Sequence, residues 1–145
     1  MIHLVALLAL PVAAFADDPI GQIKTQAGTV QIERAGKRLD ARVGDHLFRS
    51  DVLTTGARST VGVTFADNSL LALGAFSRLS LDIFKFNTTT HEGAFDVTLK
   101  KGALAVKSGQ IVKQSPEAMR VRTPVAVLGV RGTQFAVRAD GDKAP

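Results

Sequence analysis

The sequence predicts an all-β protein: a single domain of many short, mostly antiparallel strands, sandwich- or solenoid-like, preceded by a helical signal peptide. From residue 20 onward, apolar and polar residues alternate with a period of two, which is typical of half-buried strands. Short segments rich in Gly, Asn and Asp separate these runs and predict turns. No segment after the leader keeps a helical period, so helices are not expected. Many short strands broken by turns favour an all-β domain.

The first sixteen residues are predicted to be a secretory signal peptide. The run MIHLVALLALPVAAFA is apolar and ends in the small-x-small pattern Ala14-Phe15-Ala16, directly before two acidic residues. It is shorter than the ~20 apolar residues that a membrane span needs. An uncleaved short anchor is the alternative. We expect cleavage after Ala16, a periplasmic or secreted protein, and a mature domain of residues 17–145.

The composition limits the classes of function. The chain has no cysteine, so neither disulfides nor a cysteine-linked lipid are expected. Its net charge of +5 is dispersed, and Trp and Tyr are absent. Nucleic-acid binding is therefore not expected, because it needs a concentrated basic patch and stacking aromatics. No second apolar segment follows the leader, so we expect no stable membrane span in the mature form. The oligomeric state does not follow from the sequence.

The alternation predicts which residues face the core on successive strands. These are Val30 and Ile32; Val61, Val63 and Phe65; Leu79, Leu81 and Ile83; Phe95, Val97 and Leu99; and Leu104 and Val106. Turns are expected at Ala35–Gly36, Val43–Asp45, Ala66–Ser69, Leu73–Ser77, Lys100–Gly102 and Lys107–Gln110. The turn at Lys100–Gly102 implies a hairpin between the fourth and fifth of these strands.

The stretch VRTPVAVLGVRGTQFAV, residues 121–137, predicts two strands joined by a kink at residues 128–132. Pro124 cannot donate to a strand ladder, so it implies an edge position or a bulge. Gly129 and Gly132 give the kink the backbone freedom that a Cβ would obstruct. Arg131 falls on the inward side, where a guanidinium needs a carboxylate or carbonyl partner. The candidate partners are Asp45, Asp51 and Asp67.

The same stretch resembles the end of the FecR domain, in which a V-x-T-P segment leads into a V-x-G-T-x-F-x-V strand. The segment VGDHLFRSDVLTTGARSTVGVTFADNSLLALGAFSRLSL is similar to that domain's order of G-D, T-G, a strand, D-x-S, L-x-L-G and a serine. LKKGALAVKS is similar to its late hairpin. The resemblance covers about residues 43–137, and it identifies 17–145 as a FecR-like all-β domain.

The resemblance implies a non-catalytic interaction or sensing module of the bacterial envelope. The best-known relatives span the inner membrane, sense a loaded siderophore receptor and control a sigma factor. This sequence shows no internal membrane span and no cytoplasmic segment of that kind. We therefore expect the domain's contact function, with an unidentified envelope protein as partner, and not the control of a sigma factor. Participation in iron signalling does not follow.

No residue pattern predicts catalysis, a cofactor or a metal. His46 and His91 stand far apart without metal-ligand spacing, and Asp67-Asn68-Ser69 fits an Asx turn better than a calcium loop. Gly129 to Gly132 with Arg131 favour a structural kink over an anion cradle. Two classes of function stay open. One is a module that binds a protein through an exposed strand edge, and the other is a binder of an anionic envelope component such as cell-wall glycan or lipopolysaccharide.

Overall fold

The described part of the protein consists mostly of β-strands, as the sequence predicts. The structure, a computed structural model, describes residues 17–130 and 132–140. Its elements are β1 (Gly21–Ala27), β2 (Val30–Arg34), β3 (Lys37–Asp40), β4 (His46–Leu47), β5 (Val52–Thr55), β6 (Thr60–Phe65), β7 (Leu70–Leu73), β8 (Arg78–Phe86), β9 (Gly93–Lys107), α1 (Gln110–Gln114), β10 (Met119–Arg122), β11 (Val127–Gly129) and β12 (Gln134–Ala139). No helix within the described ranges has the length and apolar character needed to cross a membrane.

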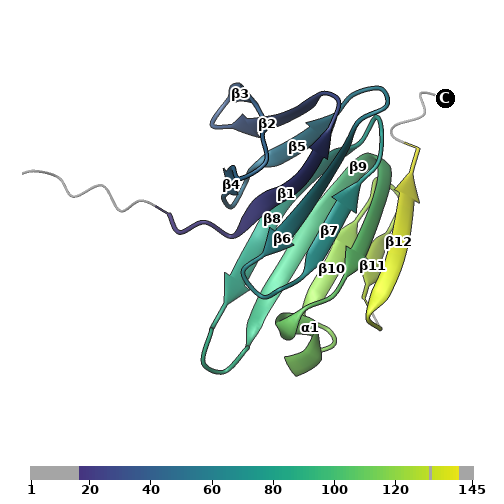
Figure 1. Cartoon of the computed structure of the whole chain (residues 1–145). Helices are drawn as coiled ribbons and strands as arrows, with labels where there is room; N and C mark the ends of the chain where they lie inside the picture. Colours follow the sequence, from purple (N-terminus) through teal and green to yellow (C-terminus); the bar gives the residue numbers. More distant parts are fainter. Residues whose placement is uncertain (1–16, 131, 141–145) are drawn as a thin grey trace, which may run out of the picture.

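The strands form one curled sheet, an open half-barrel, whose two limbs enclose the core (Figure 1). Limb A has the order β4-β1-β6-β7-β9-β12, and limb B has the order β3-β2-β5-β8-β9-β10-β11. All neighbouring pairs run antiparallel except β9 and β10, which run parallel. Figure 1 shows β10, β11 and β12 together at one side of the molecule and β3 at the other.

Strand β9 belongs to both limbs. Its first part, residues 93–101, pairs with β8, and residues 102–107 pair with β12, while 104–107 also pair with β7. The change of limb occurs at Gly102, which has a φ of 99°. The expected hairpin at Lys100–Gly102 is therefore wrong, because the chain bends there from one limb into the other and its two halves do not pair with each other.

Buried hydroxyl groups hold this bend in place. The Oγ of Ser77 accepts a hydrogen bond from the backbone N–H of Ala103 at 3.0 Å, next to Gly102. The Ser77 N–H donates to Thr55 Oγ1 at 2.9 Å, and that hydroxyl donates to the Gly74 carbonyl at 2.6 Å. Thr55 and Ser77 are both buried, so each bond satisfies a group that water cannot reach.

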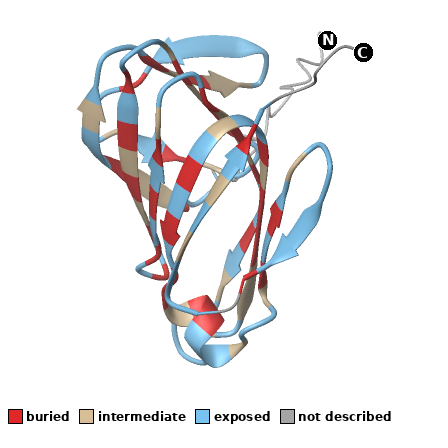
Figure 2. Ribbon diagram, turned by 90° about the vertical axis from the view of Figure 1, so that its right-hand side faces the viewer, coloured by how far each residue is buried: buried red, intermediate tan, exposed pale blue. Residues whose placement is uncertain are grey.

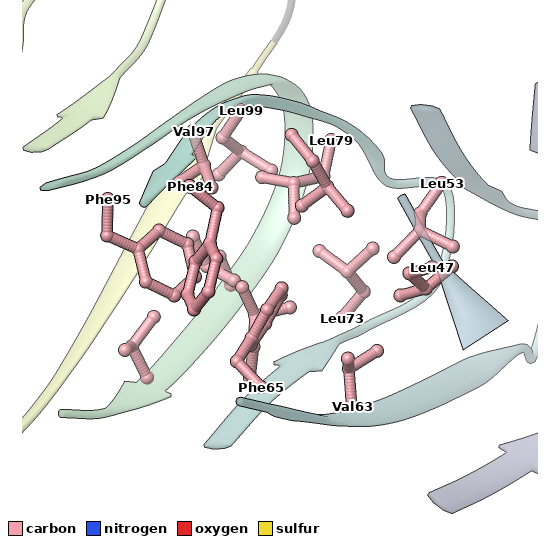
Figure 3. Close-up of a cluster of buried hydrophobic side chains, with 14 of the residues drawn as sticks. Leu47, Leu53, Val63, Phe65, Leu73, Leu79, Phe84, Phe95, Val97 and Leu99 are labelled. Atoms are coloured by element: carbon pink, nitrogen blue, oxygen red, sulfur yellow. The ribbon is translucent and has the colours of Figure 1, made fainter. Parts of the chain in front are cut away.

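Three phenylalanines join the limbs in the core (Figure 3). Phe65 of β6 lies in limb A, whereas Phe84 of β8 and Phe95 of β9 lie in limb B. The ring centroid of Phe65 is 5.7 Å from that of Phe84 and 4.6 Å from that of Phe95, and the last two rings are 5.0 Å apart. These spacings lie within the favourable range for aromatic pairs, so the three rings pack the limbs against each other.

The predicted core residues are buried, with one exception on β8. Figure 2 shows buried and exposed residues alternating along the strands. Leu79 and Leu81 are buried, but Ile83 is 42% exposed and Phe84 takes the inward position. The β8–β9 register shifts between Leu81 and Ile83, which marks a β-bulge. The extra residue reverses the alternation, so the expectation for Ile83 is wrong.

The turn between β6 and β7 is the predicted Asx turn, and it also holds α1. Asp67 is fully buried, and its carboxylate accepts bonds from the N–H of Ser69 at 3.0 Å and from the Ser69 hydroxyl at 2.8 Å. It also accepts from the N–H of Ile111 at 3.3 Å. The single-turn helix α1 was not expected; it begins where this carboxylate satisfies a free N–H.

We predict that the bend at Gly102 requires glycine for two separate reasons, conformation and space. A Cβ at Gly102 would collide with Ser77, whereas a Cβ at Gly44, with a nearly equal φ of 96°, would meet nothing within 4 Å. Gly44→Ala should therefore lower the free energy of unfolding by about 1 kcal/mol, the cost of the left-handed backbone alone. Gly102→Ala should cost about 2–4 kcal/mol in urea unfolding, since the collision adds to that cost. Equal losses in the two variants would contradict the steric part.

An ion pair on the outer surface of limb B depends on pH. Arg78 of β8 donates to both carboxylate oxygens of Glu33 on β2, at 2.9 and 2.8 Å, across the intervening strand β5. The hydrogen bonds from Arg78 hold the pKa of Glu33 below its ordinary value of 4.5. A carboxyl whose pKa is lower in the folded state stabilises the fold above its unfolded pKa and loses that contribution as pH falls through the folded pKa.

We predict that Glu33 contributes to acid unfolding. Thermal melts of the parent protein and of Glu33→Gln should be compared between about pH 6 and about pH 3. The difference in melting temperature should be largest at the higher pH and shrink as the pH falls below 4.5. A matched control is Glu117→Gln, an exposed carboxyl outside the strands. A difference for Glu33→Gln that stays constant with pH would show that its charge is not what stabilises the fold.

Candidate functional site

The stretch that the sequence singled out forms a β-hairpin that turns earlier than predicted. Strands β10 and β11 are joined by the turn Thr123–Ala126, with Pro124 and Val125 at its centre. Thr123 and Ala126 exchange backbone hydrogen bonds of 2.8 and 3.4 Å, and the Thr123 hydroxyl accepts from the Ala126 N–H at 3.1 Å. Pro124 therefore occupies a turn position that suits its fixed φ. The predicted first strand, taken as continuous through Val127, is wrong for this reason.

Strand β11 has one free edge. Its antiparallel pairing with β10 begins at the hydrogen-bonded pair Thr123–Ala126, which closes the turn. The pairing ends where the Val130 N–H donates to the Met119 carbonyl at 3.2 Å. Bonded and non-bonded pairs alternate along such a ladder, so Leu128 is bonded to β10. The N–H and C=O groups of Val127 and Gly129 therefore point away from β10. No other strand of the described residues pairs with β11, so these four groups are unpaired within the described chain.

Three apolar side chains of the turn and of β11 are exposed. Val125 is 93% exposed, Val127 57% and Leu128 39%. Leu128 lies opposite Val121, which is fully buried, so the core's inner face continues to Leu128 at the edge of limb B. Val127 lies on the outer face, so the strand exposes apolar side chains on both of its faces. Such a patch at a free strand edge is typical of an interaction surface.

Two arginines of β10 flank this edge on the outer face. Arg120 lies opposite Gly129, and Arg122 lies opposite Val127. A carboxylate oxygen of Asp96, on β9, is 3.8 Å from Arg122. Arg120 is exposed and makes no ion pair with any residue between 17 and 140 that the structure describes. The edge therefore combines an apolar strand with one uncompensated cation.

The other edges of the described sheet differ from β11. Strand β3 is an edge of charged residues, KRLD, and β4 has only two residues. Strand β12 pairs with β9 alone. The hydrogen bond from Ser108 N–H to the Thr133 carbonyl shows which pairs of this ladder are bonded. The backbone N–H and C=O groups of Gln134, Ala136 and Arg138 therefore point to the free edge of β12. Charges and short length are common means of blocking edge pairing. Strand β11 carries no charge of its own.

The outer surface of limb A holds an open groove of about 570 Å³. Gly62, Ala72 and Ala105 lie in one register row across β6, β7 and β9, and they leave a shallow apolar floor. Lys24 and Lys107 stand on its rim. The described strands of this groove therefore present a basic rim around small apolar side chains.

The predicted site residues fall in different places. Pro124 lies in the hairpin turn, and Gly129 ends β11 without a positive φ, whereas Gly132 has a φ of 95° in the connection to β12. Ala14, Ala16 and Arg131 lie outside the described residues, as does any anion cradle built on Arg131.

The three carboxylates considered as partners for Arg131 have other hydrogen bonds. Asp51 accepts from Arg34 at 2.7 and 2.9 Å, and Asp45 accepts from the N–H of Arg42 at 2.8 Å, while Asp67 holds the β6–β7 turn. The ring of His91 lies against Phe86, with centroids 5.9 Å apart. Within the described part of the chain, no three His, Cys, Asp or Glu side chains come together as a possible metal site.

Sequence reasoning missed Val127 and Arg120 as site residues. The apolar composition of residues 124–128 is visible in the sequence, but alternation predicts a strand that continues through Val127 to the kink at residues 128–132. Only the pairing of β10 with β11 shows that Val127 faces a free edge beside Arg120.

The comparison with protein-family models agrees with the ordered motifs of the sequence. Comparisons with curated proteins and with solved structures give no match. The family model described as FecR protein matches residues 51–144, more than half of the chain and a range that includes the β10–β11 hairpin. The chain therefore belongs to the FecR protein family.

Proposed function

We propose that this protein is a non-enzymatic interaction module of the bacterial envelope, exported by residues 1–16, that binds another envelope protein through the free edge of β11. The FecR family is an envelope-associated family of sensing and regulatory proteins. The apolar leader of the sequence supports export. The observation that carries the proposal is the free edge of β11 with its exposed apolar side chains.

The β11 edge suits the addition of a partner strand. The outward N–H and C=O groups of Val127 and Gly129 offer up to four backbone hydrogen bonds, each worth about 0.5–1.5 kcal/mol net. A strand placed there would also cover Leu128, which extends the core at the edge. Main-chain bonds supply affinity in this mode of binding, and neighbouring side chains supply specificity.

We predict that a proline at position 127 abolishes binding without unfolding the protein. The Val127 N–H points away from β10, so Val127→Pro removes no internal hydrogen bond but blocks the edge. Ala136→Pro is the matched control, since it places a proline at an outward position of another free edge, that of β12. The mature protein and both variants should be used to capture crosslinked partners from intact envelopes at low and high salt. We expect a salt-resistant protein partner that is lost with Val127→Pro and kept with Ala136→Pro.

Circular dichroism and thermal melts of the two variants separate binding from stability. Both should fold, with melting temperatures within a few degrees of the parent. A partner that Val127→Pro still captures at full yield would exclude β11 as the binding edge. Loss of the partner in the β12 variant alone would move the interaction to that strand.

The groove on limb A favours a second candidate, a binder of an anionic envelope component. Its small apolar floor and the cations Lys24 and Lys107 on its rim suit an acyl chain with an anionic head group, as in lipopolysaccharide, better than a glycan. Trp and Tyr, which commonly stack on sugars, are absent from the sequence. Binding driven by this rim would weaken steeply with salt. Salt-sensitive capture of lipopolysaccharide, with no protein partner at either salt, would support this candidate over the first.

A further inference from the structure

We infer that the β11 edge selects an extended partner strand that carries an acidic residue opposite Gly129, because the Arg120 side chain has room to extend to that position across the glycine. This inference rests on the proposed function, since it specifies which strand the edge of β11 accepts. The expected partner segment is an extended strand that carries an acidic residue on its outer face and apolar residues on its inner face.

The pairing of Arg120 with Gly129 leaves an open path from the guanidinium to the edge. The two residues are directly opposite in the β10–β11 ladder and form a pair without mutual hydrogen bonds, in which side chains lie closest. Gly129 has no side chain, and a Cβ built on it would meet nothing within 4 Å. The Arg120 side chain therefore has room to extend over Gly129 toward the next strand position.

Of the two arginines on this face, Arg120 is the one without an ion-pair partner among the described residues. Asp96 is its register neighbour on β9, but the carboxylate of Asp96 forms its ion pair with Arg122. The exposed Arg120 then presents an uncompensated positive charge beside the free backbone groups. An acidic residue opposite Gly129 in the added strand would lie on the same face as Arg120, where an arginine can bind it bidentately.

The inner face of the edge requires an apolar residue. Leu128 extends the row that begins at Val97 and Val121, both fully buried. A residue that faces Leu128 from an added strand would enter this apolar row, where a charged side chain is costly. Because side chains alternate along a strand, the neighbours of the acidic residue are the ones that meet Leu128.

Charge argues against a second copy of this chain as the occupant. A copy that paired through its own β11 would bring only Val127, Leu128 and Gly129 to the edge, with no acidic side chain. It would also place two further arginines on the same face. The net charge of +5 adds a general repulsion between copies.

The test uses the exported mature protein and three synthetic ten-residue peptides that alternate Val and Thr. The peptides differ only at one central Thr position, which becomes Glu, Gln or Lys. Fluorescence anisotropy at low salt should give the tightest binding for the Glu peptide, about 2–5-fold tighter than for Gln, with Lys the weakest. Arg120→Ala should remove this preference, so that the Glu and Gln peptides bind with equal affinity. Arg138→Ala, an exposed arginine of β12, is the matched control and should leave the preference intact.

The outcomes separate this inference from the proposed function. A Glu preference that survives Arg120→Ala, or equal binding of the three peptides, overturns the role of Arg120 while the edge itself stands, provided that Val127→Pro abolishes binding. Binding that survives Val127→Pro, or no binding of any peptide, overturns both. Sedimentation of the protein alone should show a monomer; a dimer that Val127→Pro dissolves would identify a second copy as the occupant and overturn the inference.

Discussion

The passage of β9 from one limb to the other is the constraint on which the rest of the structure depends. One strand provides the centre of limb B with residues 93–101 and the ladder for β7 and β12 in limb A with residues 102–107. Gly102 makes the change of direction possible, and the buried hydroxyl of Ser77 occupies the space that a side chain there would need. Because both limbs share this strand, the phenylalanines on β6, β8 and β9 can meet in one core.

The same strand explains why the free edge at β11 is held in a fixed position. Strand β10 pairs in parallel with the first half of β9, and its inward residues Met119 and Val121 are fully buried. Strand β11 contributes little to the core, and its position depends on β10. An edge that is ordered before binding loses less conformational entropy when a partner strand adds to it. Strand β10 thus anchors the hairpin and β11 is exposed, so the proposed binding surface is separate from the residues that stabilise the fold.

The sequence predicted the fold class and most of the core because alternation reflects a physical period of two. It failed where one residue changes that period or where a turn lacks the usual polar residues. The bulge after Leu81 exposes Ile83 and buries Phe84, and nothing in RLSLDIFKF marks that shift. The glycine after Lys100–Lys101 is compatible with both a hairpin and a crossing, and only long-range pairing decides between them. The turn at Pro124-Val125 is apolar, so the sequence pattern predicts strand there.

The candidate site was less predictable than the core for a related reason. The apolar character of a residue indicates in the sequence that it is buried. A free edge has no such signal, because it depends on the absence of a neighbouring strand. Pro124 and Gly129 were recognised as unusual residues, but their roles depend on pairing that spans from β9 to β11. Arg120 has no local signal at all, since it becomes significant only opposite a glycine in the neighbouring strand.

A free strand edge can pair with a second copy of the same protein. The features around β11 disfavour such pairing without blocking the edge. The strand has only three residues, so a copy can form few backbone bonds with it. Its neighbours Arg120 and Arg122 are on the face that two paired copies would share, and like charges in such positions are destabilising. The glycine that opens the path for Arg120 also removes a side chain that would otherwise bury apolar surface between copies. The arginines disfavour pairing of β11 with a second copy, while the backbone groups of β11 stay available. In the proposed mode of binding, specificity would therefore come from repulsion as much as from attraction.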